Sequence, residues 1–197
     1  MRPRRSTPLR RHERGRIAVT RGQMTENVAA NVPMLKGPFN FFQIAYVTSD
    51  LERAARVLGA SYGIGNFQVN RDVPIETTTG TARAHFALAF IGSQQLEIIQ
   101  PAGGADGAYR DELPSEGFGM RMHHAGSLVT DAAEWESIRA SVIASGHATP
   151  VGGVFSYEGV PLMHYLYADT RRLLGHYLEF MYQTEAGRDM FANVPRY

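Results

Sequence analysis

The chain has 197 residues, 44% of them hydrophobic and 20% charged, as in one globular domain or two small modules that share a core. It contains no cysteine, which excludes disulfides and thiolate metal sites, so a metal must bind to histidine, carboxylate, amide or backbone oxygen. No run approaches the roughly eighteen apolar residues that suggest a membrane span, and we expect a soluble, cytoplasmic protein without a membrane partner.

The net charge of +1 conceals a basic N-terminal segment and an acidic remainder. Residues 1–22 contain eight of the twenty basic residues and one acid, Glu13, which leaves a net charge of −6 for the rest. This acidic remainder argues against a nucleic-acid partner for the folded part. The basic segment has the composition of a nucleic-acid arm or a transit peptide, but we interpret residues 1–37 as a disordered extension, or as the product of a start upstream of Met24.

The first predicted module covers residues 38–101. Residues 41–47 form a short apolar run, which predicts a strand. Ser49, with Glu52 three positions later, fits a capping box at the start of a helix. We expect this helix to end near Leu58, before a glycine.

The rest of the first module contains a loop and a hairpin. Residues 61–79 are rich in Gly, Asn, Pro and Thr, which predicts a loop with one weak edge strand near 67–69. Residues 82–90 and 94–100 flank the turn sequence Ile-Gly-Ser and predict two paired strands. Pro101 is expected to end the module.

The same order of elements recurs after a Gly-rich linker, residues 102–119. The second module covers residues 120–183 and begins with a predicted strand at 122–129. Asp131 and Glu134 mark the start of its helix. A glycine-rich loop at residues 152–153 and closing strands at 162–167 and 175–182 follow, and residues 184–197 are interpreted as a C-terminal tail.

Four polar residues occupy matched positions in the two halves. Gln43 and His124 lie near the start of the first strand, each seven positions before the aspartate at the helix entrance. Glu97 and Glu179 lie inside apolar closing strands, 54 residues after Gln43 and 55 after His124 respectively. A carboxylate in such a run is costly to bury unless it is paired or bound to a metal. The repeat therefore predicts one site that both modules build.

These four side chains have the chemistry of a divalent metal site. One amide oxygen, one imidazole and two carboxylates carry a charge of −2 and suit zinc, nickel, cobalt, manganese or iron(II). Alternation along a strand predicts that Ala45 and Val47 lie on the side of Gln43, where they would line an apolar cup. The same register favours His124 over His123, which we expect to point to the opposite face.

The motifs QIAYVTSDLERA, QLEIIQP, HHAGSLVTD and YADTRRLLGHYLEF resemble the vicinal oxygen chelate superfamily, over about residues 41–182. That superfamily includes glyoxalase I, methylmalonyl-CoA epimerase, extradiol dioxygenases and bleomycin-resistance proteins. The resemblance implies an α+β fold in which two βαβββ modules form one cupped mixed sheet. It also implies one divalent metal ion, held by Gln43, Glu97, His124 and Glu179.

The resemblance further implies a glyoxalase-like lyase or isomerase that acts on a small molecule. It would remove a proton next to a carbonyl and stabilise the enediolate on the metal, with Glu179 first and Glu97 second as the base. The alternatives are an acyl-CoA epimerase of the methylmalonyl-CoA type and a non-catalytic drug-binding protein. His85, His164 and His176 are interpreted as structural, and two modules can form one cup alone or exchange in a homodimer.

Overall fold

The computed structural model describes residue 35 and residues 39–197, so nearly all of the predicted basic extension lies outside the described residues. The elements of the described part follow each other along the chain as β1 (Phe41–Thr48), α1 (Leu51–Tyr62), β2 (Gln68–Thr77), β3 (Gly80–Ile91), β4 (Gln94–Gly104), α2 (Gly107–Arg110), β5 (Met120–Val129), α3 (Ala132–Ala144), β6 (Gly152–Tyr157), β7 (Val160–Ala168), α4 (Arg171–Leu174) and β8 (Tyr177–Gln183).

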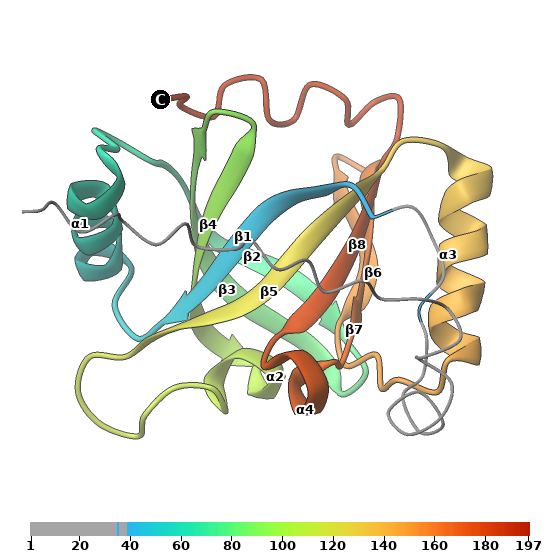
Figure 1. The fold of residues 1–197 in the computed structure, drawn as a ribbon, viewed down its shortest axis with the longest axis horizontal. Helices are drawn as coiled ribbons and strands as arrows, with labels where there is room; N and C mark the ends of the chain where they lie inside the picture. The colour runs from blue at the N-terminus through green and yellow to red at the C-terminus, as the bar shows by residue number, and fades with distance from the viewer. Residues whose placement is uncertain (1–34, 36–38) are drawn as a thin grey trace, which may run out of the picture. The chain divides into compact units, whose positions relative to one another are not determined.

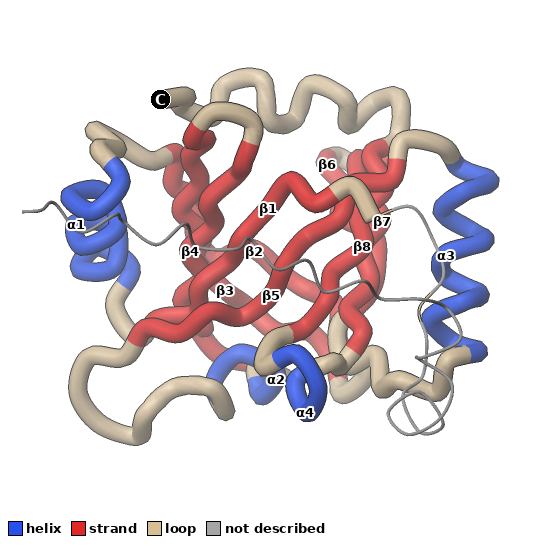
Figure 2. The backbone as a smooth tube through the Cα atoms, in the orientation of Figure 1, coloured by secondary structure: helices blue, strands red, loops and turns tan. Residues whose placement is uncertain are grey.

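All the strands join one curved sheet in the order β2-β3-β4-β1-β5-β8-β7-β6. Within each module the first strand runs parallel to the last, β1 with β4 and β5 with β8. The modules meet where β1 pairs antiparallel with β5. Helices α1 and α3 lie on opposite sides of this central pair, each packed on the sheet of its own module (Figures 1 and 2). The predicted α+β fold with two βαβββ modules is confirmed.

The two edge strands approach each other and nearly close the sheet. Thr77 at the end of β2 forms an isolated bridge with Val151, next to β6. The amide of Thr78 donates to the carbonyl of Pro150 (3.0 Å), and the amide of Glu76 donates to the hydroxyl of Tyr165 (2.9 Å). The concave side of the sheet is therefore a cup that is closed where β2 meets β6.

Separate apolar clusters fill the cup and lie under the helices. The concave cluster includes Ala45, Val47, Tyr177 and Met181, which confirms the predicted facing of Ala45 and Val47. A second cluster packs α1 against β3 and β4, and a third packs α3 around Trp135. The polar residues of the cup are therefore surrounded by packed apolar side chains of the concave cluster.

The first helix differs from the prediction at both ends. Its N-cap is Asp50, whose side chain accepts from the amide of Arg53, whereas Ser49 binds the backbone of Gly117 and Gly119. The predicted capping box at Ser49 is therefore wrong. The helix also continues to Tyr62 and ends where the following glycine adopts a left-handed conformation.

Most of the predicted loop at residues 61–79 is strand. Strand β2 spans ten residues, with an irregularity in its pairing between Asn70 and Val73, where Asp72 has a φ of 57°. Pro74 is compatible with this strand because β2 lies at the edge of the sheet. Likewise, Gly152 and Gly153 begin β6 instead of forming a loop.

The predicted linker and tail both contain ordered structure. Strand β4 continues past Pro101 to Gly104, and α2 lies within the linker. The C-terminal residues return across the fold to β3: the amide of Phe90 donates to the carbonyl of Pro195 (2.7 Å), and the amide of Tyr197 donates to the carbonyl of Phe90 (3.0 Å). None of the helices in the described part of the chain is long and apolar enough to cross a membrane.

Candidate metal centre

Strand register brings the predicted ligands of the two modules to one point. Ala45 of β1 pairs with Glu97 of β4, and Gly126 of β5 pairs with Glu179 of β8. The two glutamates thus occupy equivalent places in their modules. Strands β1 and β5 are neighbours, and Gln43 pairs with Gly126 and Ala45 with His124, so the four predicted ligands lie close together at the centre of the sheet.

The imidazole of His124 is the centre of the cluster. Its Nε2 atom lies 3.0 Å from Oε2 of Glu179 and 3.3 Å from Oε2 of Glu97. The same nitrogen lies 3.1 Å from Oε1 of Gln43. His124 is fully buried, while both carboxylates and the amide line the cavity of the cup. His124 therefore contacts the other three predicted residues, and the role of all four as ligands stays a prediction.

The donor atoms fit a divalent metal ion in type and spacing. Ligand atoms bound to one ion at about 2.0–2.2 Å are about 3.0 Å apart in octahedral geometry and about 3.4 Å apart in tetrahedral geometry. The three distances from His124 Nε2 lie in this range. The described residues form no preformed metal cage of three or more histidine and carboxylate side chains.

The histidine doublet differs from the prediction. The pairing of β1 with β5 shifts between Ala45 and Tyr46, so that His124 pairs with Ala45 and Met122 with Tyr46. His123 is the extra residue of this β-bulge, and its ring points into the cup beside that of His124. The expectation that His123 points to the opposite face is wrong, because it assumed unbroken alternation along the strand.

Hydrogen bonds fix the ring orientation of both histidines. The carbonyl oxygen of Ala108 lies 3.0 Å from Nε2 of His123 and accepts its proton, because a carbonyl has none to donate. Nδ1 of His123 is then an acceptor, and it lies 3.0 Å from Nδ1 of His124, which donates to it. This arrangement directs Nε2 of His124 toward the carboxylates, as an outer hydrogen-bond partner of a metal-binding histidine does.

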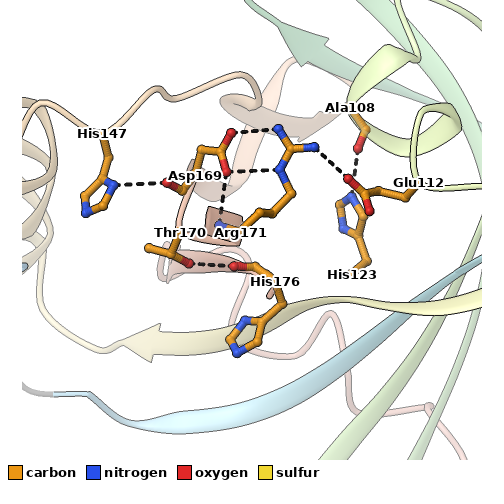
Figure 3. Close-up of polar contacts among 8 residues, drawn as sticks. All are labelled: Ala108, Glu112, His123, His147, Asp169, Thr170, Arg171 and His176. Atoms are coloured by element: carbon orange, nitrogen blue, oxygen red, sulfur yellow. Dashed lines mark hydrogen bonds and ion pairs between the residues drawn. The ribbon is translucent and has the colours of Figure 1, made fainter. Parts of the chain in front are cut away.

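An ion-pair network holds the segment that carries the Ala108 carbonyl (Figure 3). Arg171 of α4 contacts Glu112 (2.6 Å), just after α2, and Asp169 (2.7 Å). The guanidinium of Arg171 also lies over the ring of Tyr177, 4.4 Å from its centroid. Arg171 therefore fastens α2 to the second module, directly beneath the histidine doublet.

Burial and charge give the site an uneven electrostatic field. Burial lowers the pKa of His124, but the carboxylates of Glu179 and Glu97 outweigh this effect and raise it to about 9. Burial raises the pKa of Glu179, an effect that His124 partly opposes. Burial and the neighbouring His124 lower the pKa of His123 to about 3, so the His123 ring is neutral. The two carboxylates thus concentrate negative charge around Nε2 of His124, and a metal ion would bind there in place of the proton on this nitrogen.

Two residues that no sequence pattern singled out support the site. Gln95 is fully buried, and its Oε1 accepts from Nε2 of Gln43 (2.6 Å), which turns the oxygen of the Gln43 amide toward His124. Tyr109 of α2 stacks on the ring of His123 at 4.9 Å. By contrast, His85, His164 and His176 make no hydrogen bond to His124 in the described part of the chain. Nδ1 of His85, for example, accepts from the amide of Asp72.

The cluster forms the floor of a cavity of about 910 Å³. This volume lies within the range of small-molecule sites. The walls come from both modules and from the C-terminal tail, which contributes Met190 and Phe191. The tail was predicted only as an extension beyond the second module, so its part in the cavity was not expected.

Comparison with known proteins identifies the fold. No family model and no curated protein matches the sequence. A variant of Streptomyces coelicolor methylmalonyl-CoA epimerase in complex with 2-nitronate-propionyl-CoA is similar with a TM-score of 0.51 at 16% identity, covering 76% of this chain and 98% of that chain. Methylmalonyl-CoA epimerase from Mycobacterium tuberculosis is similar with a TM-score of 0.50 at 11% identity, covering 77% and 93%.

Both of these proteins are members of the vicinal oxygen chelate superfamily. The chain therefore has the vicinal oxygen chelate fold, and the resemblance that its motifs predicted is confirmed at the level of the fold.

Proposed function

We propose that this chain is a metal-dependent isomerase or lyase that removes a proton next to a carbonyl group. The observation that carries the proposal is the meeting of Glu97 and Glu179 at one imidazole nitrogen, on the floor of a cavity that accepts a small molecule. A pair of carboxylates at a polarised carbonyl is the arrangement that such proton transfer requires. The fold of methylmalonyl-CoA epimerase, which acts on an acyl thioester, supports the same class of chemistry.

Glu179 is the proposed base. Burial raises its pKa in the metal-free protein, and as a ligand it would have to leave the metal ion to accept a proton. It lines the cavity and lies on the last strand of the second module, opposite Glu97 of the first. Because both carboxylates face the same small volume, one accepts the proton from the substrate while the other, Glu97, is placed to return it.

Gln43, Glu97, His124 and Glu179 would hold the metal ion. A bound divalent ion supplies Lewis acidity, which stabilises negative charge on the carbonyl oxygen of the substrate. The protein holds the imidazole in its orientation through His123, and it holds the amide of Gln43 through Gln95.

Metal binding and proton exchange test the proposal together. Metal-free protein is titrated with nickel, zinc, cobalt or manganese by calorimetry, and the loaded protein is assayed for deuterium uptake next to the carbonyl of hemithioacetals and acyl thioesters. We expect His124→Ala to lose metal binding and Glu179→Gln to lose exchange. Glu76→Gln is the matched control, because Glu76 lines the same cavity outside the cluster.

Two outcomes would contradict this function. If purified protein binds none of these metals and no exchange is detected, the chain is a non-catalytic binding protein. If Glu179→Gln keeps full exchange activity, the assignment of the base is wrong.

An acyl thioester epimerase is the second candidate. The fold match to methylmalonyl-CoA epimerase favours it, and it needs the same proton transfer at the same carboxylates. The two candidates differ in the part of the substrate beyond the reacting carbonyl group, which the cavity must accommodate.

A further inference from the structure

The walls of the cavity are mainly apolar above its polar floor. Apolar side chains come from both edge strands and their neighbours and from the tail: Val69, Val73, Ile75, Phe86, Leu88, Val154, Phe155, Leu162, Met163, Met181, Met190 and Phe191. Burial of a ligand methylene against such walls is worth about 0.8 kcal/mol. Each methylene that reaches them therefore strengthens binding about fourfold.

The charged residues that line the cavity are mostly acidic. Arg71 is its basic residue, and this side chain forms an ion pair with Glu52. Asp72, at the same edge, pairs with Arg83 at 2.5 Å. The other charged lining residues are acidic: Glu76 at the wall and the two carboxylates of the floor. A ligand with several negative charges would meet repulsion from these carboxylates, and Arg71, already paired with Glu52, is the one cation among the described lining residues.

The tail makes the apolar wall continuous. Phe191 packs with Leu88 and Phe90 of β3, and the backbone bonds of Phe90 to Pro195 and Tyr197 hold the tail in place. The ring of Phe191 also lies 6.3 Å from that of Phe42, next to the floor. The tail is therefore part of the wall above the candidate metal centre.

We infer that the substrate is an uncharged molecule with an apolar body of several carbons and with its oxygen atoms at one end. The oxygens face the floor, and the apolar body lies between the tail and β6. The inference rests on the proposed function only for the placement of the oxygen end. It disfavours a coenzyme A thioester, whose phosphates the acidic cavity repels.

Binding to metal-free protein tests the inference separately from catalysis. N-phenyl-1-naphthylamine, an uncharged fluorescent probe, is titrated first, and 1,2-decanediol, 1,2-butanediol and propionyl-CoA are then used to displace it. We expect 1,2-decanediol to displace the probe at least tenfold more effectively than 1,2-butanediol, and propionyl-CoA to displace little. If propionyl-CoA is the better competitor, the inference is wrong.

Charge placed on the wall gives a second readout. Phe191→Asp, and Val154→Asp on the second-module side, are expected to weaken probe binding at least tenfold. Val154 is 42% exposed, so its substitution leaves the core intact even if Phe191→Asp fails to fold. Leu173→Asp is the control, because Leu173 is 52% exposed on α4 and outside the lining. Unchanged probe affinity in a folded Val154→Asp protein would overturn the inference.

The two proposals fail separately. Absence of metal binding and proton exchange, with the probe results as expected, would overturn the proposed function and leave this inference standing. Metal-dependent exchange that is fastest with coenzyme A thioesters would support the proposed function and overturn this inference.

Discussion

The Nδ1 atom of His123 lies 3.0 Å from the Nδ1 atom of His124, and this contact links the candidate metal centre to the segment between the two modules. His123 in turn contacts the carbonyl of Ala108 in α2. Since α2 lies outside the repeated βαβββ units, a non-repeated segment determines which nitrogen of His124 faces the carboxylates.

The first prediction concerns this contact. His123→Phe keeps the aromatic packing on Tyr109 but removes the acceptor for Nδ1 of His124. Loss of an outer hydrogen-bond partner typically lowers metal affinity 10- to 100-fold, and we expect a decrease of that size for zinc or nickel in calorimetric titrations. His123→Gln restores an acceptor and a donor, so it should recover part of the affinity. Equal affinity in His123→Phe and the parent protein would show that the contact does not orient the ligand.

The second prediction concerns the close approach of β5 to the site. A Cβ atom added at Gly126 would lie 2.8 Å from Oε1 of Gln43 and 2.9 Å from Cε of Met181. We expect Gly126→Ala to displace the amide of Gln43, weaken metal binding and lower the free energy of unfolding by about 1–3 kcal/mol. Gly107→Ala is the control, because its Cβ would meet its nearest neighbour, Asp111, at an ordinary 3.6 Å. Urea unfolding and metal titration measure both effects.

Much of the fold could be predicted because both halves of the sequence show the same order of elements. Matched spacings in the two halves indicated the order of elements along the chain and placed Glu97 and Glu179 at equivalent points, which the strand register reproduces. Alternation also predicted correctly that Ala45 and Val47 face the cup. These features follow from the alternation of side chains between the two faces of a strand, which the sequence alone displays.

The remaining features depend on contacts between distant segments. A bulge shifts the register at His123, and its presence depends on the pairing of β5 with β1. Strand β2 has a turn-like composition, with Pro74 and a positive φ at Asp72, and it forms because β3 offers an edge. The support of Gln43 by Gln95 likewise arises only when β1 and β4 pair.

The third prediction concerns the pH dependence of stability. The hydrogen bonds from Arg171 are the main cause that lowers the pKa of Asp169 below its usual value of 3.8. Because the folded pKa is depressed, the stabilisation is complete above the unfolded pKa and is lost as the pH falls through the folded value. In urea unfolding from pH 6 to pH 3, we expect Asp169→Asn to be less stable than the parent protein near pH 6. The difference should shrink toward pH 3, and a constant difference would contradict this account.

The fourth prediction concerns the attachment of the tail to the first module. Three backbone hydrogen bonds join Phe90 and Gly92 to the last residues: Phe90 to Pro195, Tyr197 to Phe90 and Gly92 to Tyr197. Removal of residues 195–197 leaves the amides of Phe90 and Gly92 without these partners. We expect these two amides to exchange with solvent faster by at least tenfold in hydrogen-exchange measurements, and probe binding to weaken because Phe191 loses its support. The amide of Tyr167, which donates to the carbonyl of Val151 on the other side of the cup, should keep its protection. Equal protection of Phe90 in both proteins would show that the tail is held by its side chains alone.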